Sequence, residues 1–310
     1  MLPTQISVVV PVFNEAENIE EVHARLTAAL DGGPAYELIF VDDGSTDEGF
    51  ALLARLHDKD PRVRVIRLTR NFGQHAALTA GIDHARGEAL VSFDADLQFD
   101  PHDILRLVAK LEEGYDVASG ARDRREDGML RRRIPSMLVS WMMGLVTGQR
   151  LRDAASPLKA ARADLLRTVQ VSGEMRRFLG ALVLRSGRRV AEIPVSHRPR
   201  RAGASKYSFL DLVAGYVDFI TAFWPRAFQA VGLVGALCVI LSVVGVVLYA
   251  LARLLVDVPP LLRAQLQIVI AIAGVFGVQC LILGLLGELT ARIYRLVQDR
   301  PLYAVREILG

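Results

Sequence analysis

Two carboxylates that are two positions apart, Asp94 and Asp96, are the side chains of this sequence best suited to hold a metal ion. They follow the apolar stretch Ala89–Phe93, which is typical of a strand, and Gln98 continues the spacing with an amide oxygen. Alternate residues of a strand point to the same side, so both carboxylates can bind one hard cation such as Mg²⁺ or Mn²⁺. An isolated D-x-D pair is more often a surface turn, so the surrounding elements must decide between the two interpretations.

Polar turns follow the strands that the sequence predicts around this pair. Apolar and β-branched stretches, with helical patterns between them, predict strands at Ile6–Val10, Glu37–Val41, Val63–Leu68, Ala89–Phe93 and Asp116–Ser119. The turns behind the first three are polar and cover Pro11–Glu15, Asp42–Asp47 and Arg70–Gly73. Ligands of an open parallel sheet bind beyond the carboxyl ends of its strands, so these turns and the D-x-D pair are expected to meet in one crevice. The predicted fold class is therefore α/β with a mainly parallel sheet.

The sequence excludes several common classes of protein. No G-x-G-x-x-G follows a strand and no G-x-x-x-x-G-K-[ST] occurs, which argues against dinucleotide oxidoreductases and P-loop NTPases. Carboxylates repel phosphate, so a divalent cation must lie between this crevice and any phosphorylated ligand. The 37 Lys and Arg nearly balance the 34 Asp and Glu, which gives no indication of a nucleic-acid partner. The two cysteines, Cys238 and Cys280, lie in apolar runs and predict neither a disulfide framework nor a zinc site.

Two long uncharged runs, Ala227–Ala252 and Leu266–Gly287, predict membrane-spanning helices. Each is long enough to cross a bilayer core, which takes about 20 residues of helix. The short connector contains Pro259 and Pro260, so the two spans are expected to form an antiparallel hairpin. Basic residues are more frequent beside the outer ends than in the connector, and the positive-inside rule therefore places the rest of the chain in the cytoplasm. The alternative is a pair of buried helices in a large soluble core.

The two runs set the expected domain boundaries. We expect a cytoplasmic domain at 1–207, a juxtamembrane amphipathic helix at 208–225, membrane helices at 227–252 and 266–287 within 226–290, and a cytoplasmic tail at 291–310. The stretch Ile134–Gly148 is too short to span and is either interfacial or buried in the cytoplasmic domain. Close helix approach at Gly232, Gly235, Gly274 and Gly277 favours a homo-oligomer.

Five motifs, in order, resemble the family 2 glycosyltransferases that act on polyprenyl phosphates, such as the dolichyl-phosphate mannose synthases and the undecaprenyl-phosphate glucosyltransferases. The motifs are Val8–Glu15, Val41–Asp47, Arg70–Gly73, Asp94–Gln98 and Gly203–Tyr207. The hairpin and the segment Arg300–Tyr303 resemble the bacterial, membrane-anchored members. The resemblance implies a GT-A nucleotide-sugar domain in a multi-pass protein of the cytoplasmic (inner) membrane. It also implies the transfer of a sugar, with UDP-glucose as the expected donor, to undecaprenyl phosphate.

The resemblance also implies roles for individual residues. Those expected around the nucleotide base and ribose are Pro11, Asn14, Glu15 and Asp43. Those expected to hold Mg²⁺ or Mn²⁺ against the diphosphate are Asp94, Asp96 and Gln98. Phosphate groups are expected to face Arg122 and an arginine of the run 131–133, taken as Arg131. The element near the sugar runs from Asp153 through Ser156 to Lys159, although Pro157 replaces the commoner Gly. The element for the acceptor phosphate includes Arg200, Ser205 and Lys206. Catalytic roles fall to Asp96, Arg122, Arg200 and Lys206.

The chemistry of the expected acceptor simplifies the mechanism. A phosphate monoester has its second pKa near 6, so it is already a dianionic nucleophile at neutral pH and requires no general base. Direct displacement predicts inversion at the anomeric carbon.

Three other functions remain open at this point. The first is a GDP-mannose-dependent polyprenyl-phosphate mannose synthase. The second is a processive polysaccharide synthase, which needs more spans and a Q-x-x-R-W element that Gln149-Arg150 does not complete. The third is a membrane adaptor without enzymatic activity.

Overall fold

The structure, a computed structural model, describes residues 6–122, 148, 153, 156–168, 189–196, 227–255, 259–297 and 302–310. The chain divides into two compact units. The first comprises Met1–Lys206 together with Arg300–Gly310, and the second comprises Tyr207–Asp299. The second unit is therefore an insertion between two parts of the first.

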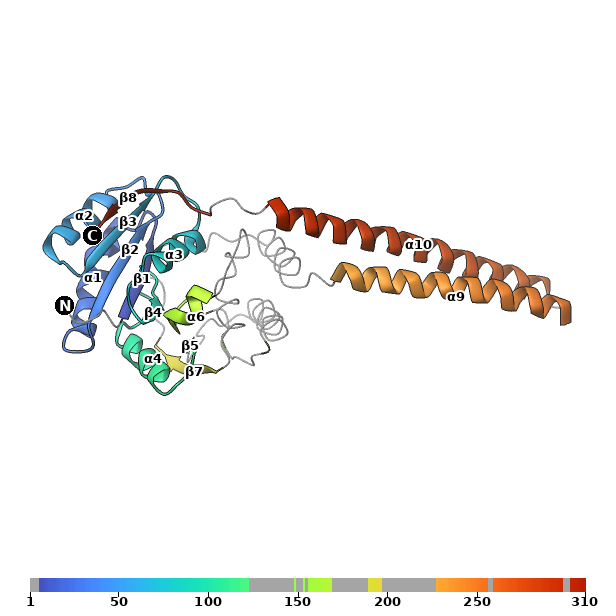
Figure 1. Cartoon of the computed structure of the whole chain (residues 1–310), viewed down its shortest axis with the longest axis horizontal. Helices are drawn as coiled ribbons and strands as arrows, with labels where there is room; N and C mark the ends of the chain where they lie inside the picture. Colours follow the sequence, from blue (N-terminus) through green and yellow to red (C-terminus); the bar gives the residue numbers. More distant parts are fainter. Residues whose placement is uncertain are drawn as a thin grey trace. The chain divides into compact units, whose positions relative to one another are not determined.

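An eight-stranded sheet in the order β7-β5-β6-β4-β1-β2-β3-β8 forms the centre of the first unit (Figure 1). Its strands are β1 (Ile6–Val12), β2 (Tyr36–Asp42), β3 (Val63–Leu68), β4 (Ala89–Ser92), β5 (Val117–Arg122), β6 (Lys159–Arg162), β7 (Val190–Val195) and β8 (Val305–Leu309). Strands β4, β1, β2 and β3 run parallel to one another, and so do β5 and β7. Strands β6 and β8 are antiparallel to their neighbours. The predicted α/β class is confirmed, with a sheet that is mixed rather than wholly parallel.

Helices cover both faces of the sheet, which explains the continuous apolar runs of its central strands. The helices that the structure describes in this unit are α1 (Ala16–Leu30), α2 (Gly49–Lys59), α3 (Gln74–Asp83), α4 (His102–Glu112) and α6 (Ala163–Thr168). Along β1, Val8 and Val10 face the core under α1 and α4, whereas Val9 faces the core under α3. Helix α3 lies very close to β1 at Gly81, where an added Cβ would be 2.2 Å from a methyl carbon of Val9. The strands are thus fixed from both sides, and their carboxyl ends have defined positions.

Strand β8 comes from the segment for which the sequence indicated only a tail, 291–310. It pairs antiparallel with β3 and matches Val65 with Leu309. The Thr69 amide donates to the Ala304 carbonyl over 2.9 Å, and the Arg64 side chain donates to the Gly310 carbonyl over 3.3 Å. A five-residue strand that is half exposed and carries two charged residues gives little sequence signal. Residues beyond the hairpin therefore complete the sheet.

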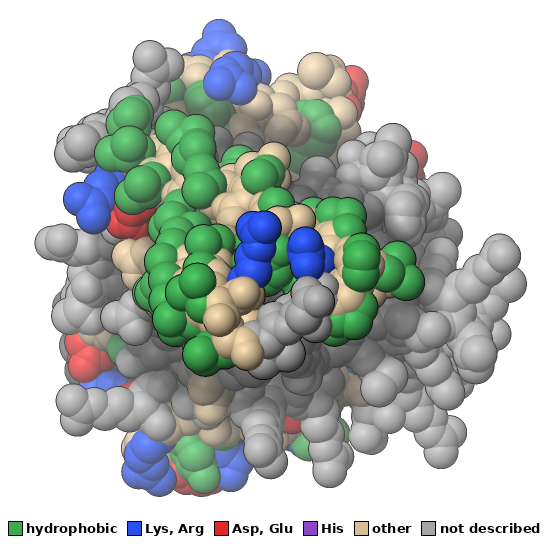
Figure 2. Space-filling model, turned by 90° about the vertical axis from the view of Figure 1, so that its right-hand side faces the viewer, with side chains coloured by type: hydrophobic (Ala, Val, Ile, Leu, Met, Phe, Trp, Pro, Cys, Tyr) green, Lys and Arg blue, Asp and Glu red, His purple; other side chains and the backbone are tan. Residues whose placement is uncertain are grey.

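The second unit is a hairpin of two long helices, α9 (Ala227–Leu255) and α10 (Pro260–Val297). Segments of 28 and 34 residues within them are long and apolar enough to cross a membrane, as the sequence predicted. Only 6% and 17% of their most apolar stretches are buried, which argues against the alternative of helices in a soluble core. Figure 2 looks onto the end of the hairpin where α9 and α10 are connected, and it shows mostly hydrophobic side chains there with few charged ones among them.

The glycines of the hairpin lie between its own two helices. An added Cβ at Gly235 would be 2.7 Å from the Gly277 carbonyl oxygen, and one at Gly284 would be 2.7 Å from the Gly232 Cα. At Gly274 the neighbour is Ser242 of α9, at 2.8 Å. Close approach at these glycines is therefore used within one chain, and it does not support the expected homo-oligomer.

Candidate functional site

The turns after β1 and β2 are linked to each other by Asn14. Its backbone amide donates to the Ser45 hydroxyl over 3.0 Å, and its side-chain oxygen accepts a hydrogen bond from the Thr46 backbone amide over 2.8 Å. Asn14 has φ +53°, a left-handed conformation that asparagine tolerates better than most residues. The side chain expected at the nucleotide thus also fixes the shape of the turn after β2.

Asp43 links the turn after β2 to the turn after β3. The residue is 2% exposed, and its two carboxylate oxygens accept the backbone amides of Phe72 and Gly73, each over 2.8 Å. Burial raises the pKa of Asp43, although these two amides act in the opposite direction. Next to it, Gly44 has φ +71°, and an added Cβ would be 2.5 Å from the Arg70 backbone. Only glycine fits this contact between the two turns.

The D-x-D segment follows β4 as predicted, but its backbone is not extended. The strand ends at Ser92, Asp96 lies in a turn with Ala95, and Leu97 after it has φ +59°. Burial nevertheless alternates: Asp94, Asp96 and Gln98 are half-buried, and the residues between them are buried. Gln74 at the start of α3 donates to Asp94 over 2.7 Å, and the Gln98 amide donates to Asp96 over 3.2 Å.

The donor atoms of this turn fit a hard divalent cation. Carboxylate and amide oxygens at a half-exposed edge are the ligands that Mg²⁺ and Mn²⁺ prefer, and they leave room for substrate oxygens. Within the described ranges, no three or more His, Cys, Asp or Glu side chains gather as an all-protein metal cage. Asp94 and Asp96 are the carboxylates of this turn that could hold such a cation.

The other half of the site is an ion pair at the end of β5. The guanidinium of Arg122 donates to both carboxylate oxygens of Asp153, over 2.5 and 2.8 Å, and the Asp153 amide donates to Glu192 over 2.8 Å. Asp153 is 6% exposed, so this two-point pair is largely shielded from water. The sequence indicated that Arg122 faces phosphate groups, and the structure shows its guanidinium engaged by Asp153.

Lys159, at the start of β6, is the last residue of the element that the resemblance places near the sugar, but it was not among the residues given a role of their own. It is 9% exposed, and its ammonium donates to the Ser156 carbonyl. Burial lowers the pKa of Lys159 to about 8, against the attraction of Asp153. The signal was its place three positions after Ser156 in the element matched near the sugar, but the sequence does not show that this lysine is buried.

The structure brings the remaining predicted residues to the same edge or does not describe them. Pro11 is half-buried near the end of β1, and Glu15, directly before α1, accepts the Asn18 side chain over 2.6 Å. The residues expected at the acceptor and at the second phosphate contact lie outside the described ranges, and they are Arg131, Arg200, Ser205 and Lys206. The segments 134–147 and 208–225 also lie outside them.

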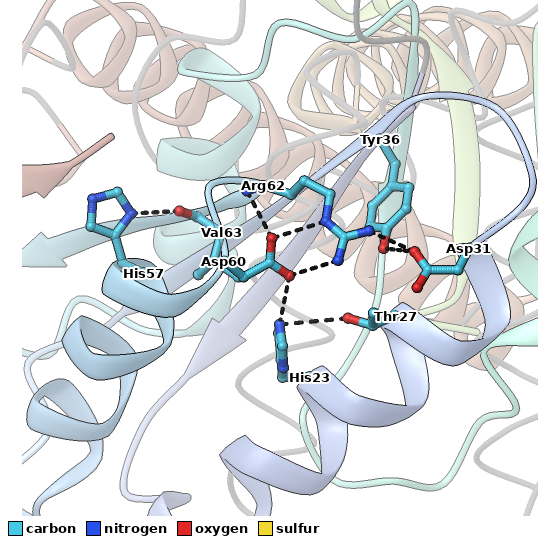
Figure 3. A network of polar contacts seen from close by, with 8 residues as sticks. All are labelled: His23, Thr27, Asp31, Tyr36, His57, Asp60, Arg62 and Val63. Carbon is cyan, nitrogen blue, oxygen red and sulfur yellow. Dashed lines mark hydrogen bonds and ion pairs between the residues drawn. The ribbon is translucent and has the colours of Figure 1, made fainter.

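A second polar network lies at the opposite edge of the sheet, near the amino ends of β2 and β3 (Figure 3). Arg62 donates to both oxygens of Asp60, each over 2.9 Å, and to Asp31 over 2.6 Å. Burial raises the pKa of Asp60, but the bonds from Arg62 and His23 outweigh it and lower that pKa to about 2. Burial, followed by the bond to Asp31, raises the pKa of Tyr36 to about 12. Hydrogen bonds link these groups in one chain from His23 to Tyr36, so we assign the network a role in the stability of the fold.

The chain is similar to several known sugar transferases. The family described as "Glycosyl transferase family 2" matches residues 7–167. Undecaprenyl-phosphate 4-deoxy-4-formamido-L-arabinose transferases of Salmonella paratyphi A and Salmonella enteritidis are each 34% identical over 317 residues, which cover 98% of this chain and 94% of theirs. The similarity therefore includes the hairpin as well as the sheet.

Among solved structures, glucosyl-3-phosphoglycerate synthase from Mycobacterium tuberculosis has a similar fold. Its complex with Mn²⁺, UDP and glucosyl-3-phosphoglycerate is 24% identical, with a TM-score of 0.51 over 72% of this chain and 80% of that one. Its complex with Mn²⁺, UDP-glucose and phosphoglyceric acid is 21% identical, with a TM-score of 0.52. At this level of identity the likeness shows the fold, which is of GT-A type.

Proposed function

The chain belongs to glycosyltransferase family 2, and from this membership we propose that it transfers a sugar from a nucleoside diphosphate sugar to polyprenyl phosphate. The observation that carries the proposal is the similarity to undecaprenyl-phosphate sugar transferases over 98% of the chain, hairpin included. A lipid-linked acceptor gives the hairpin a purpose, since it keeps the transferase domain next to a phosphate that cannot leave the bilayer.

The nucleotide of the donor and its sugar are proposed on separate grounds. A UDP-sugar is favoured over a GDP-sugar because the glucosyl-3-phosphoglycerate synthase of similar fold was solved with UDP and with UDP-glucose. For the sugar itself, UDP-glucose was the expectation from the sequence motifs, whereas the relatives at 34% identity are named for 4-deoxy-4-formamido-L-arabinose. We therefore propose a UDP-linked pentose or hexose and take these two sugars as the first to test.

The residues of the site suit a metal-assisted transfer. Asp94 and Asp96, with Gln98, would hold Mg²⁺ or Mn²⁺, and the bound cation would supply positive charge beside the departing diphosphate. The Arg122–Asp153 pair would border the phosphate groups and the sugar. The acceptor phosphate, bound by the element that contains Arg200 and Lys206, is already dianionic at neutral pH, so the site needs no general base. Direct attack gives a product with inverted anomeric configuration.

The membrane arrangement follows from the charges beside the hairpin. Basic residues that flank its outer ends favour a cytoplasmic transferase domain, and two spanning helices would make the protein multi-pass in the inner membrane. A processive synthase is disfavoured because the described part of the chain contains two candidate spans. A homo-oligomer remains a prediction.

A donor panel tests the proposal. Full-length protein in detergent is incubated with Mg²⁺ or Mn²⁺, undecaprenyl phosphate and a set of UDP- and GDP-sugars, and the lipid products are weighed by mass spectrometry. We expect a lipid-linked sugar from at least one UDP-sugar, an inverted configuration by NMR coupling, and loss of product in Asp96→Ala. A GDP-sugar as the only substrate would favour the mannose synthase. The absence of every lipid product, or an equally active Asp96→Ala variant, would contradict the proposed transfer.

A further inference from the structure

Lys159 lies between the two halves of the site. Strand β6 is the neighbour of both β4 and β5, and in the sheet Lys159 is paired with Ser92 of β4 and Ser119 of β5. Asp94 comes two residues after Ser92, and Arg122 comes three residues after Ser119. A side chain at the start of β6 is therefore placed between the D-x-D turn and the Arg122–Asp153 pair.

The groups around Lys159 interact with the charge of its ammonium rather than only with its hydrocarbon chain. Its buried ammonium has one hydrogen bond to a protein group within the described ranges, to the Ser156 carbonyl. Burying an ammonium with so few acceptors is costly unless nearby charges compensate for it. The charges that favour the ammonium are those of Asp153, Asp94 and Glu192, and Arg122 opposes them.

Two buried hydroxyls beside this lysine point the same way. The Ser119 and Ser156 side-chain oxygens have no hydrogen-bond partner within the described part of the chain, and these residues are 0% and 1% exposed. Unsatisfied buried polar groups in a native fold call for an explanation. The end of β5 and the start of β6 thus carry buried polar groups that the described part of the chain leaves without partners, as expected beside a site for charged ligands.

We propose that Lys159 is a positioning residue whose positive charge acts both on Asp94 and on the Arg122–Asp153 pair. On the metal side, a fixed cation beside Asp94 lowers the affinity of the D-x-D turn for a dication. On the donor side, the same charge favours the anionic diphosphate and keeps Asp153 from being drawn toward the metal. The inference rests on the proposed metal-assisted transfer.

The test measures the affinity for Mn²⁺ and the KM of the donor at pH 7. At this pH, a pKa of about 8 leaves Lys159 mostly protonated. The variants are Lys159→Met, which removes the charge at similar length, Lys159→Gln, which keeps a hydrogen bond to Ser156, and Lys159→Arg, which keeps the charge. Lys110→Met, which removes an exposed lysine paired with Glu113, is the matched control. Free Mn²⁺ is counted by electron paramagnetic resonance on full-length protein without substrate, and the KM of the donor is measured separately.

Loss of the charge should shift the two readouts in opposite directions. We expect Lys159→Met and Lys159→Gln to bind Mn²⁺ more tightly and to raise the donor KM, each by about tenfold, because one nearby unit charge is removed. Lys159→Arg should stay close to wild type in both, and Lys110→Met should change neither.

Four results would overturn the inference, and the last of them leaves the proposed metal site intact. The first is uncharged variants that fold, by thermal unfolding, and keep both constants within about twofold of wild type. The second is weakening of both constants in proportion to the unfolded fraction, which makes Lys159 a structural residue. The third is equal Mn²⁺ binding by wild type and Asp96→Ala, which also removes the proposed metal site. Wild type that binds more tightly than Asp96→Ala, with Lys159→Met unchanged, would refute the inference alone.

Discussion

Replacing Asp43 by Asn tests whether this carboxylate acts by holding the turn after β3. Its two oxygens accept the Phe72 and Gly73 amides over 2.8 Å each. An asparagine offers one acceptor oxygen and turns an NH₂ group toward the other amide. The variant therefore loses one charge-assisted hydrogen bond, which contributes about 1.5–3 kcal/mol.

That energy sets the size of the expected effects. Opening of the turn becomes easier by the same amount, so the Phe72 and Gly73 amides should exchange with solvent roughly 10- to 150-fold faster, at 1.4 kcal/mol for each factor of ten. Gln74 follows this turn and donates to Asp94 over 2.7 Å. The donor KM should therefore rise as well, by at most the same factor.

Hydrogen exchange of the unliganded full-length protein, followed by mass spectrometry, measures the turn directly. Asp116→Asn is the matched control, because its carboxylate also accepts a backbone amide, that of Arg189 over 2.9 Å, but at the amino end of β5. Unchanged exchange at Phe72 and Gly73 together with a higher donor KM would refute the reasoning. Asp43 would then act by touching the nucleotide, as the motif resemblance implies.

Two further predictions concern the hairpin and the network at the opposite edge of the sheet. Gly235→Ala should lower the thermal unfolding temperature of the protein in detergent, because the added Cβ would lie 2.6 Å from the Leu281 amide nitrogen. The control Gly232→Ala should unfold at the wild-type temperature, because the atom nearest to its added Cβ is 3.9 Å away. Equal unfolding temperatures of the two variants would contradict the helix packing at Gly235. Asp60→Asn should destabilise the protein at pH 7 by at most about 2 kcal/mol. The folded pKa of Asp60, about 2, is below its ordinary value of 3.8, so this stabilisation is complete above about pH 4 and is lost as the pH falls toward 2. Urea unfolding at pH 7 and pH 3 should show the gap between wild type and variant narrowing, and a constant gap would contradict the assignment.

The sequence predicted the strands of the sheet centre well because they are buried on both faces. The stretch predicted as Val63–Leu68 is strand β3 residue for residue, and β1 begins at Ile6 as expected. The D-x-D turn was located but not its shape, since nothing in the sequence indicates that Leu97 adopts a positive φ. Strand β8 was missed because its partner β3 is more than 200 residues away in the chain, as in the Arg64–Gly310 contact.

Roles of side chains were harder to predict than their positions. Asn14 and Asp43 were expected at the nucleotide, and the structure shows both bonding to neighbouring turns. Short polar side chains at strand ends can do either, and the residue type does not distinguish the two. Lys159 was matched to the element near the sugar, but its burial was not predicted, because it depends on the insertion of β6 between β4 and β5, a tertiary feature that no local pattern reports.

Strand β8 is synthesised last, after the two long helices, so it is also the last strand to join the sheet. The ribosome releases Val305–Leu309 only after both long apolar helices have been made. Until then β3 has an unpaired edge, of the kind that recruits other chains, and the Thr69 amide lacks the Ala304 carbonyl. The nascent transferase domain therefore completes its last row of hydrogen bonds after the hairpin is available for insertion, which ties the end of its folding to delivery at the bilayer.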